Sequence, residues 1–284
     1  MKTIGFVDYY ISEWHANNYP EWIKQVSEKL GEDFVVKYAW AEEYVSPVDG
    51  RNTDEWCKEF GVEKCQTIEE LCEKADYILV LAPSDPEKHL GYAKAVLKYK
   101  KNTYIDKTFA PDYKTAKEIF DIAEGYGTKF FSSSALRYGA ELEDVVGGVS
   151  MFTQGGGGNM PEYIIHQVEM AVKVLQEKAV KVRVEKQGSN QYICAVEFEN
   201  GKRATMSYSQ GYSFGVCVEG QDGKAKNIPA LSNTFNGLIE DILRFYNTGK
   251  VSFDTNQTLE VMKIREAIIK GQNELGVWIN LREN

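Results

Sequence analysis

Lys107 occupies a position that suits chemistry, because it follows the apolar stretch Thr103–Asp106 and precedes a break at Pro111. Such a run is typical of a strand buried on both faces, and proline cannot extend a strand. Ligands of a parallel sheet bind at the carboxyl ends of its strands. An ammonium held there can steady an alkoxide or a nucleotide hydroxyl. The alternative is a surface lysine paired with Asp106.

His166 is the second candidate, on a helix predicted over Pro161–Gln176. Residues three or four apart share a helix face, so His166 lies in line with Glu162, Glu169 and Lys173, opposite an apolar stripe. If that face borders a cleft between domains, His166 can take a hydroxyl proton while Glu162 orients it or raises its pKa. The alternative is a solvated face with ion pairs. Both interpretations stay open at this point.

The first half of the chain alternates strands with helices, which predicts a doubly wound parallel sheet of the nucleotide-binding type. Gly31 ends the first helix, and Thr67 with Glu70 has the pattern of an N-terminal cap. The charged stretch around Gly50 is expected to be irregular. Strands are predicted at Thr3–Asp8, Phe34–Tyr38, Asp76–Ala82, Thr103–Asp106 and Lys129–Phe131, and helices at His15–Leu30, from Thr67, at Pro86–Lys100 and at Asp112–Tyr126.

The second half predicts an α/β domain with an open, mainly antiparallel sheet, because its strands alternate apolar and polar residues and flank the turn Asn200-Gly201. The glycine-rich stretch Val146–Asn159 is expected to be mobile. Residues 1–133 are assigned to a Rossmann-type domain and residues 134–284 to the second domain. Its strands are predicted at Val180–Lys186, Tyr192–Glu197, Ala204–Tyr208 and Phe214–Val218, and its closing helices, Asn236–Asn247 and Asn256–Leu275, are candidates to pack on the first domain.

Composition and charge argue against several classes of partner. The net charge is −9 and the basic residues are scattered, which excludes nucleic acid and anionic membranes as expected partners. No apolar run approaches the ~20 residues that span a bilayer, and the N-terminus reaches an acid too early for a signal peptide. The 5 cysteines contain no CxxC pair, so we expect reduced thiols in a cytoplasmic protein, without a metal site.

Several short motifs occur in a fixed order and spacing along the chain. They are Ala82-Pro83 with His89, Asp106-Lys107 followed by Thr108, Arg137-Tyr138, the helix segment Pro161–Met170, and the ending Gly249–Leu281. Together they resemble the Gfo/Idh/MocA oxidoreductases, the relatives of glucose–fructose oxidoreductase and inositol dehydrogenase. Asp106-Lys107 matches that family's Glu-Lys-Pro signature with Thr108 in place of the proline. Glu162 and His166 match its Asp-x-x-x-His helix.

The resemblance implies NAD or NADP as the cofactor and a sugar, polyol or related hydroxyl compound as the substrate. It also implies a homo-oligomer, a dimer or tetramer, formed through the second sheet. By position, Lys107 would bridge cofactor and substrate oxygen, His166 would be the general base, and Glu162 would support it. The residues carried over as cofactor-binding are Asp8, Tyr9, Tyr10, His15, Ala82, Pro83, His89, Asp106, Lys107 and Arg137.

One stretch departs from the family pattern. A G-x-G-x-x-G turn lets a pyrophosphate approach a helix N-terminus, whereas Asp8–Pro20 contains no glycine. Side chains there would crowd a pyrophosphate, and Asp8 or Glu13 would repel it. After the second strand, Glu42 is a candidate ribose ligand; a solvated loop acid is the other interpretation.

Three functions remain open from the sequence. The first is a dehydrogenase that holds its dinucleotide in a changed pose, stacked on Tyr9, Tyr10 or Trp14. The second is a redox-inactive relative that binds a sugar. The third is a non-redox acid–base enzyme that uses the same lysine, glutamate and histidine for elimination or epimerisation.

Overall fold

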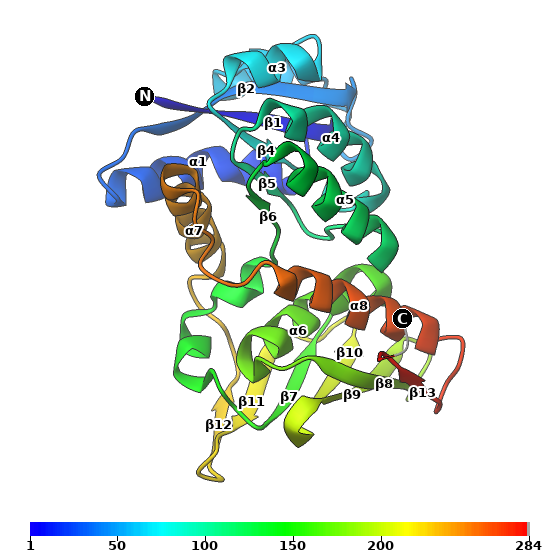
Figure 1. The fold of residues 1–284 in the computed structure, drawn as a ribbon. Coiled ribbons are helices and arrows are strands. Elements are labelled where there is room, and N and C mark those ends of the chain that lie inside the picture. The colour runs from blue at the N-terminus through cyan, green and yellow to red at the C-terminus, as the bar shows by residue number, and fades with distance from the viewer. Residues whose placement is uncertain (283–284) are drawn as a thin grey trace. The chain divides into compact units, whose positions relative to one another are not determined.

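The computed structural model describes residues 1–282 of the chain, which form two compact units (Figure 1). The first unit contains Met1–Ser133 and Leu238–Thr255. The second contains Ser134–Gly237 and the chain from Asn256 on. Within residues 1–282, no helix combines the length and the apolar character that crossing a membrane requires.

The first unit is built on a six-stranded sheet in the order β3-β2-β1-β4-β5-β6, and every neighbouring pair is parallel. This confirms the predicted Rossmann-type, doubly wound sheet. The parallel order brings the carboxyl ends of all these strands to one edge. The strands are β1 (Lys2–Tyr10), β2 (Phe34–Glu43), β3 (Glu63–Lys64), β4 (Tyr77–Val80), β5 (Thr103–Ile105) and β6 (Phe130–Phe131).

Helices cover both faces of this sheet. Phe6 on β1 contacts Trp56, whereas a Cβ on the preceding Gly5 would meet Leu71, so these two helical side chains lie on opposite faces. Trp56 belongs to α2, so α2 and α1 lie on one face of the sheet (Figure 1). Leu71 belongs to α3, which lies on the other face together with α4 and α5. The helices are α1 (Trp14–Lys29), α2 (Thr53–Phe60), α3 (Ile68–Lys74), α4 (His89–Val96) and α5 (Tyr113–Tyr126), with 3-10 turns at Pro86–Lys88 and Leu97–Tyr99.

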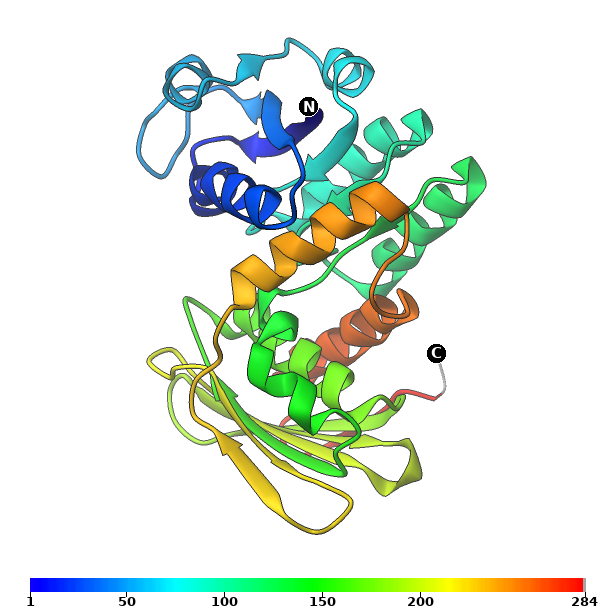
Figure 2. The ribbon, with the colours of Figure 1, turned by 90° about the vertical axis from the view of Figure 1, so that its left-hand side faces the viewer.

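The helix α7 (Thr234–Thr248) returns to the first unit from Leu238 onward. It lies beside α1 (Figure 2), where Lys29 pairs with Glu240 at 3.0 Å. Near its end, Tyr246 stacks on Tyr77 of β4 with ring centroids 4.7 Å apart. A segment distant in sequence therefore completes the packing of the first unit.

Local signals in the sequence set several boundaries of the first unit. Thr67 caps α3 by accepting the Glu70 amide at 3.1 Å, as predicted, and Gly31 has φ +67° directly after α1. The strand β2 runs to Glu43, beyond the predicted end at Tyr38. The charged stretch around Gly50 is irregular as expected, whereas α2 and β3, which follow it, were not predicted.

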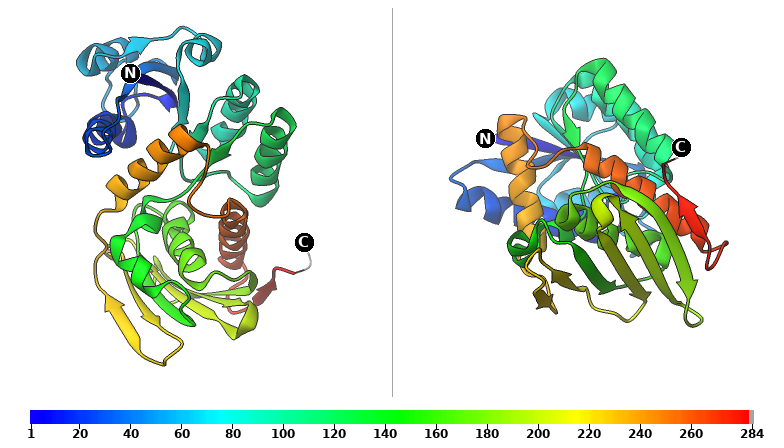
Figure 3. Two further views of the ribbon diagram at one scale, coloured as in Figure 1. Left: turned by 60° about the vertical axis from the view of Figure 1, so that its left-hand side comes forward. Right: turned by 60° about the horizontal axis from the view of Figure 1, so that its bottom comes forward.

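The second unit contains a seven-stranded sheet in the order β12-β11-β7-β10-β9-β8-β13. Only the β7–β10 pair is parallel among these described strands, which confirms the predicted open and mainly antiparallel sheet. The helices α6 and α8 pack on one face, and no described helix covers the other (Figure 3). The elements are β7 (Ser150–Gly155), α6 (Met160–Leu175), β8 (Ala179–Lys186), β9 (Gln191–Phe198), β10 (Arg203–Ser209), β11 (Gly215–Glu219), β12 (Ala225–Ile228), α8 (Asn256–Gly271) and β13 (Trp278–Asn280), with 3-10 turns at Ala135–Tyr138, Ala140–Val145 and Glu199–Gly201.

The glycine-rich stretch is part of the packed sheet, so the expectation of a mobile segment is wrong. Its middle part, Ser150–Gly155, is β7, which lies between β11 and β10. A Cβ at Gly155 would overlap the ring of Phe214, and one at Gly156 would overlap the backbone of Ser209. These glycines therefore allow close approach to neighbouring elements, which local composition alone does not distinguish from flexibility.

Candidate functional site

Two buried aspartates lie at the carboxyl edge of the first sheet, Asp8 in β1 and Asp106 directly after β5. Asp8 Oδ1 accepts hydrogen bonds from the amides of Tyr9 at 2.7 Å and Ala82 at 3.0 Å. Asp106 Oδ1 accepts the Lys107 amide at 2.8 Å. Within residues 1–282, the Oδ2 atom of each aspartate has no hydrogen-bond partner. The edge therefore holds two buried carboxyl oxygens with unused acceptor capacity.

The turn from β1 into α1 places a carboxyl group on the helix N-terminus. Glu13 is the N-cap residue, and its side chain accepts hydrogen bonds from the amides of His15, at 2.8 Å, and of Ala16. Glu13 is 6% exposed. The neighbouring Ser12 donates to Asp49 Oδ2 at 2.7 Å. Because free amides at a helix N-terminus are the usual donors to a phosphate, Glu13 takes the place that a phosphate occupies after a glycine-rich turn.

His15 lies between Glu13 and Asp106, and Tyr19 is buried near the same two acids. His15 Nδ1 lies 3.2 Å from Glu13 Oε2, and its Nε2 lies 3.8 Å from Asp106 Oδ2. Burial raises the pKa of Tyr19, with the charges of Asp106 and Glu13 adding to the effect. Burial also raises the pKa of Asp8, and the nearby Glu13 adds to it. Asp8 therefore favours its neutral form, because three carboxylates cannot share this buried site without strong repulsion.

Lys107 follows Asp106 at the same edge and is half-buried. Its ammonium forms no ion pair with any of the residues that the structure describes. The alternative of a lysine paired with the Asp106 side chain is therefore not observed. Tyr9 and Tyr10 lie at the end of β1 with ring centroids 5.6 Å apart, and the Lys88 ammonium lies 4.2 Å from the centroid of the Tyr9 ring. Among the described residues, this edge therefore presents the unpaired ammonium of Lys107 and two neighbouring aromatic rings.

His89 is fully buried and joins the segments that follow β4 and β5. Its Nε2 lies 2.5 Å from the Leu81 carbonyl oxygen and its Nδ1 lies 3.0 Å from that of Phe109. Burial lowers the pKa of His89 against the opposing effect of the two carbonyls. Ala82, with φ 63°, and the buried Pro83 form the turn between β4 and this histidine. Because both ring nitrogens are engaged within the fold, His89 positions these segments and has no free nitrogen for a ligand.

Glu42 is a strand residue rather than a loop acid, but its side chain is 38% exposed, so the solvated part of that interpretation holds. It lies in β2, where its carboxylate accepts hydrogen bonds from Lys88 Nζ at 2.6 Å and from the Tyr92 hydroxyl at 2.7 Å. The bond from Lys88 is the main reason that the pKa of Glu42 is lowered. An acid at this end of the second strand is the usual partner of a dinucleotide ribose in a Rossmann fold.

The dinucleotide that the resemblance implies fits part of this edge but not the turn. Glu42 has the chemistry of a ribose ligand, and the Lys107 ammonium can donate to a hydroxyl oxygen. The amides of His15 and Ala16 already donate to Glu13, however, and cannot serve a second anion. A pyrophosphate therefore does not fit against α1 while Glu13 caps the helix.

In the second unit, His166 lies on α6, which begins at the cap residue Asn159. His166 Nδ1 is 2.7 Å from Ser134 Oγ, and that oxygen also accepts the Leu136 amide at 3.1 Å. If Ser134 accepts from a protonated Nδ1, Nε2 is left as the basic nitrogen; if Ser134 donates to Nδ1, Nε2 carries the proton. Ser134 therefore sets which nitrogen of His166 can take a proton.

The other polar residues of this helix face are bonded within the unit: the ion pairs of the alternative interpretation are present, but Glu169 is buried and not solvated. Glu162 accepts a hydrogen bond from Asn159 Nδ2 at 3.1 Å. Arg137 Nε donates to Glu169 Oε1 at 2.9 Å, and each of these two residues is 3% exposed. Lys173 donates to the Arg137 carbonyl oxygen at 2.7 Å. Arg137, carried over as cofactor-binding, is here the partner in a buried ion pair.

The sequence did not fully predict the contacts of two residues, Glu13 and Ser134. Glu13 was expected to repel a pyrophosphate, but its bonds to the helix amides were not foreseen; the signal was an acid directly before the first helical residue. Ser134 was not named, although the three consecutive serines Ser132–Ser134 follow a strand of the parallel sheet. Its partner His166 is 32 residues away, beyond any local spacing rule.

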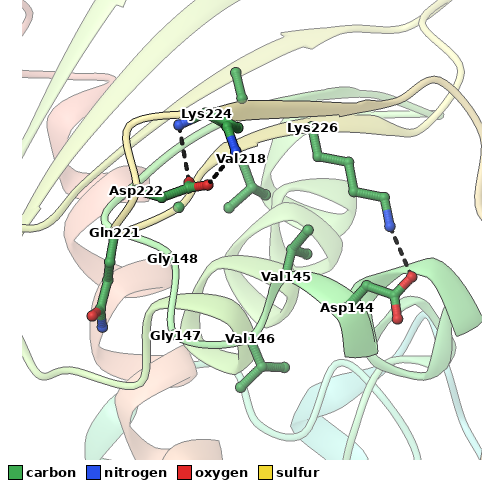
Figure 4. Close-up of a pocket in the computed structure, with 12 residues that line it drawn as sticks. Asp144, Val145, Val146, Gly147, Gly148, Val218, Gln221, Asp222, Lys224 and Lys226 are labelled. Atoms are coloured by element: carbon green, nitrogen blue, oxygen red, sulfur yellow. Dashed lines mark hydrogen bonds and ion pairs between the residues drawn. The ribbon is translucent and has the colours of Figure 1, made fainter.

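A surface pocket of the second unit, about 360 Å³ in volume, contains none of the predicted site residues. It lies between the segment Asp144–Gly148 and the β11–β12 hairpin (Figure 4). Its charged side chains pair with one another, Lys226 with Asp144 at 2.8 Å and Lys224 with Asp222 at 3.3 Å. We assign no site to this pocket.

Part of the first unit matches a known protein family. Residues 42–134 match the Gfo/Idh/MocA family, described as an oxidoreductase family with an NAD-binding Rossmann fold. The predicted resemblance is confirmed over this segment, and NAD binding is a property of the matched family. No curated protein matches the chain.

Solved structures share the fold over the full length. An NAD-binding oxidoreductase from Klebsiella pneumoniae is 14% identical with a TM-score of 0.77, and 100% of each chain is covered. GenD2 from gentamicin A biosynthesis, solved with NAD, is 13% identical with a TM-score of 0.78, covering 99% of this chain and 97% of GenD2. Scyllo-inositol dehydrogenase from Lactobacillus casei is 13% identical with a TM-score of 0.74, covering 99% and 98%.

Proposed function

We propose, from the membership of residues 42–134 in the Gfo/Idh/MocA oxidoreductase family, that the chain is an NAD(P)-dependent oxidoreductase. It would act on a hydroxyl or carbonyl group of a sugar, a polyol or a related small molecule. The observation that carries the proposal is the half-buried Lys107, two residues after β5, whose ammonium forms no ion pair within residues 1–282 and which stands where the family pattern has a lysine. The nicotinamide supplies hydride chemistry when it is bound, and the chain supplies positioning and charge.

Lys107 and His166 have separate tasks in this proposal. The Lys107 ammonium stabilises negative charge on a hydroxyl oxygen as its proton leaves. His166 takes that proton when oxidation occurs and returns it when reduction occurs. Ser134 positions His166 through Nδ1, and Glu162 belongs to the cap of the same helix. Arg137 holds α6 through its bond to Glu169.

A substrate screen with two variants tests the proposal. Turnover of sugars and polyols with NAD and NADP is followed by nicotinamide absorbance. We expect Lys107→Ala and His166→Ala each to lower kcat by roughly 10²-fold or more without unfolding the protein. Lys114→Ala removes an exposed lysine from the first turn of α5 and is the matched control. Full activity in Lys107→Ala, or loss of folding in either variant, would contradict the assigned roles.

The Glu13 cap favours a second candidate, a redox-inactive relative that binds a sugar. An occupied helix N-terminus disfavours a pyrophosphate but has no effect on a neutral polyol. Calorimetric titration separates the two functions: sugar binding that no nucleotide changes supports the second. Turnover without net oxidation or reduction would support a non-redox acid–base enzyme instead.

We also propose a homo-oligomer, a dimer or a tetramer, that forms through the second sheet. Thr153 on β7 bonds to Gln167 of α6, so the alternate residue Phe152 points to the opposite face of the sheet. Phe152 is 44% exposed on that face. Light scattering coupled to gel filtration measures the mass, and a monomer at micromolar concentration would refute this assembly.

A further inference from the structure

We propose that Glu13 is an internal occupant of the phosphate-binding position at α1 and that it sets the affinity of this chain for ligands containing a pyrophosphate. The inference rests on the proposed function and names Glu13 as the residue that controls the binding of a pyrophosphate. Such a ligand gains the helix amides only when the Glu13 carboxyl group leaves them.

The first support is geometric. The two oxygens of Glu13 accept the amides of His15 and Ala16, which lie in the first turn of a 16-residue helix. The carboxyl group is buried, and His15 Nδ1 holds one of its oxygens at 3.2 Å. A phosphate bound at a helix N-terminus uses the same amides in the same way. Two anions cannot share one set of donors.

The second support is that neighbouring side chains in the turn are engaged elsewhere. Ser12 donates to Asp49, and its carbonyl oxygen accepts the Ser46 hydroxyl at 2.7 Å. Ile11 is 2% exposed and packs in the core. Glu13 is therefore the side chain of this turn that is bonded to the first amides of α1. A single substitution can free them.

The third support is a buried carboxyl oxygen of Asp8, beside the turn, that has no hydrogen-bond partner within the described residues. Asp8 is 1% exposed, and its Oδ2 has no hydrogen-bond partner within residues 1–282. Because burial and the nearby Glu13 raise the pKa of Asp8, its carboxyl group favours the neutral form and can donate from Oδ2. A neutral Asp8 does not repel a phosphate, and Glu13 is the acid that is bonded directly to the amides a phosphate would use.

Glu13→Gln is the variant that tests this role. Glutamine is nearly isosteric, keeps one oxygen for capping, and replaces the other oxygen with a donor. Glu28→Gln makes the same charge change at an exposed position in the last turn of α1 and is the matched control. The probes are ADP-ribose, which contains the pyrophosphate, and adenosine, which contains no phosphate. Binding is measured by calorimetric titration of the full chain.

We expect Glu13→Gln to bind ADP-ribose roughly tenfold more tightly than the wild type or Glu28→Gln, since a charged competitor for two donors is removed. Adenosine affinity stays the same in all three proteins. An equal or weaker affinity for ADP-ribose in Glu13→Gln, including no binding at all, overturns the inference. An equal gain for adenosine also overturns it, because the cause would then be packing. If Glu13→Gln does not fold, Glu13→Ser keeps a hydroxyl cap and takes its place.

This experiment is separable from the test of the proposed function. If Glu13→Gln gains ADP-ribose affinity and no substrate is oxidised or reduced, the inference stands and the oxidoreductase proposal fails. If the wild type turns over substrate and binds ADP-ribose as tightly as Glu13→Gln, the oxidoreductase proposal stands and the inference fails.

Discussion

Gly156 allows a close contact between the start of the α6 loop and β10, and its replacement by alanine should destabilise the second unit. An added Cβ would overlap the carbonyl oxygen of Ser209 and lie 2.6 Å from its carbonyl carbon. These are backbone atoms next to the parallel pair of Tyr208 and Gly155, so they cannot rotate away as a side chain does. Overpacking costs about 1–3 kcal/mol, and a backbone contact places the cost at about 3 kcal/mol. The entropic gain of Gly→Ala, about 0.5 kcal/mol, does not offset it.

Gly158→Ala is the matched control in the same run of glycines, because its nearest contact is the Tyr163 ring at 3.6 Å. We expect its free energy of unfolding to change by less than about 0.5 kcal/mol. Urea unfolding followed by circular dichroism gives the free energies, and hydrogen exchange of β7 and β10 locates the change. Equal stability of Gly156→Ala and Gly158→Ala would refute the packed arrangement and restore the mobile loop that composition predicts.

Two further substitutions test buried charges. Glu169→Ala leaves the Arg137 guanidinium buried without its carboxylate and should lower the free energy of unfolding in urea by about 3–5 kcal/mol. The control Glu143→Ala removes an acid that is 70% exposed and should lower it by less than about 1 kcal/mol. Equal losses would show that burial is not the cause. Asp8→Asn tests the raised pKa of Asp8. Because the folded protein binds the Asp8 proton more tightly than the unfolded chain does, the stability of the wild type decreases as pH rises above about 3.8 through the folded pKa. The variant should lack this decrease and be more stable than the wild type at neutral pH in thermal unfolding; a wild-type curve that the substitution leaves unchanged would exclude the effect.

Several elements with a local signal were predicted from the sequence, although α2 was missed despite its capping box of Asn52 and Glu55. The cap at Thr67 and the glycine at position 31 mark helix ends by backbone chemistry that acts within a few residues. The strand β2 continues to Glu43 because it pairs with β1 as far as Tyr10, which depends on the neighbouring strand. The helix periodicity of α6 identified its polar face correctly, but periodicity cannot say that Arg137 covers Glu169 there.

The candidate site likewise contains residues that local sequence signals predicted and contacts that they did not predict. Asp106 and Lys107 were predicted because the end of a buried strand and a family spacing coincide at one point in the chain. The bond between Ser134 and His166 was not, because it joins residues from a 3-10 turn and a helix that are distant in sequence. The two carbonyl partners of His89 likewise come from separate segments, so a residue that matched the family motif has a structural role that the motif does not reveal.

The turn that contains Glu13 shows that a Rossmann domain can lack its glycine-rich motif and still keep its fold. In a Rossmann domain, the glycines after β1 serve the ligand, whereas the strands and helices depend on burial and pairing. Without a phosphate, the first amides of α1 still require acceptors, and an acid at the N-cap supplies them. The same carboxyl group stabilises the helix and opposes a bound anion, so helix stability and dinucleotide affinity are coupled at this residue. Substitutions at Glu13 that strengthen ADP-ribose binding should therefore weaken α1 in the absence of the ligand, and a gain in both quantities would exclude a shared set of donors.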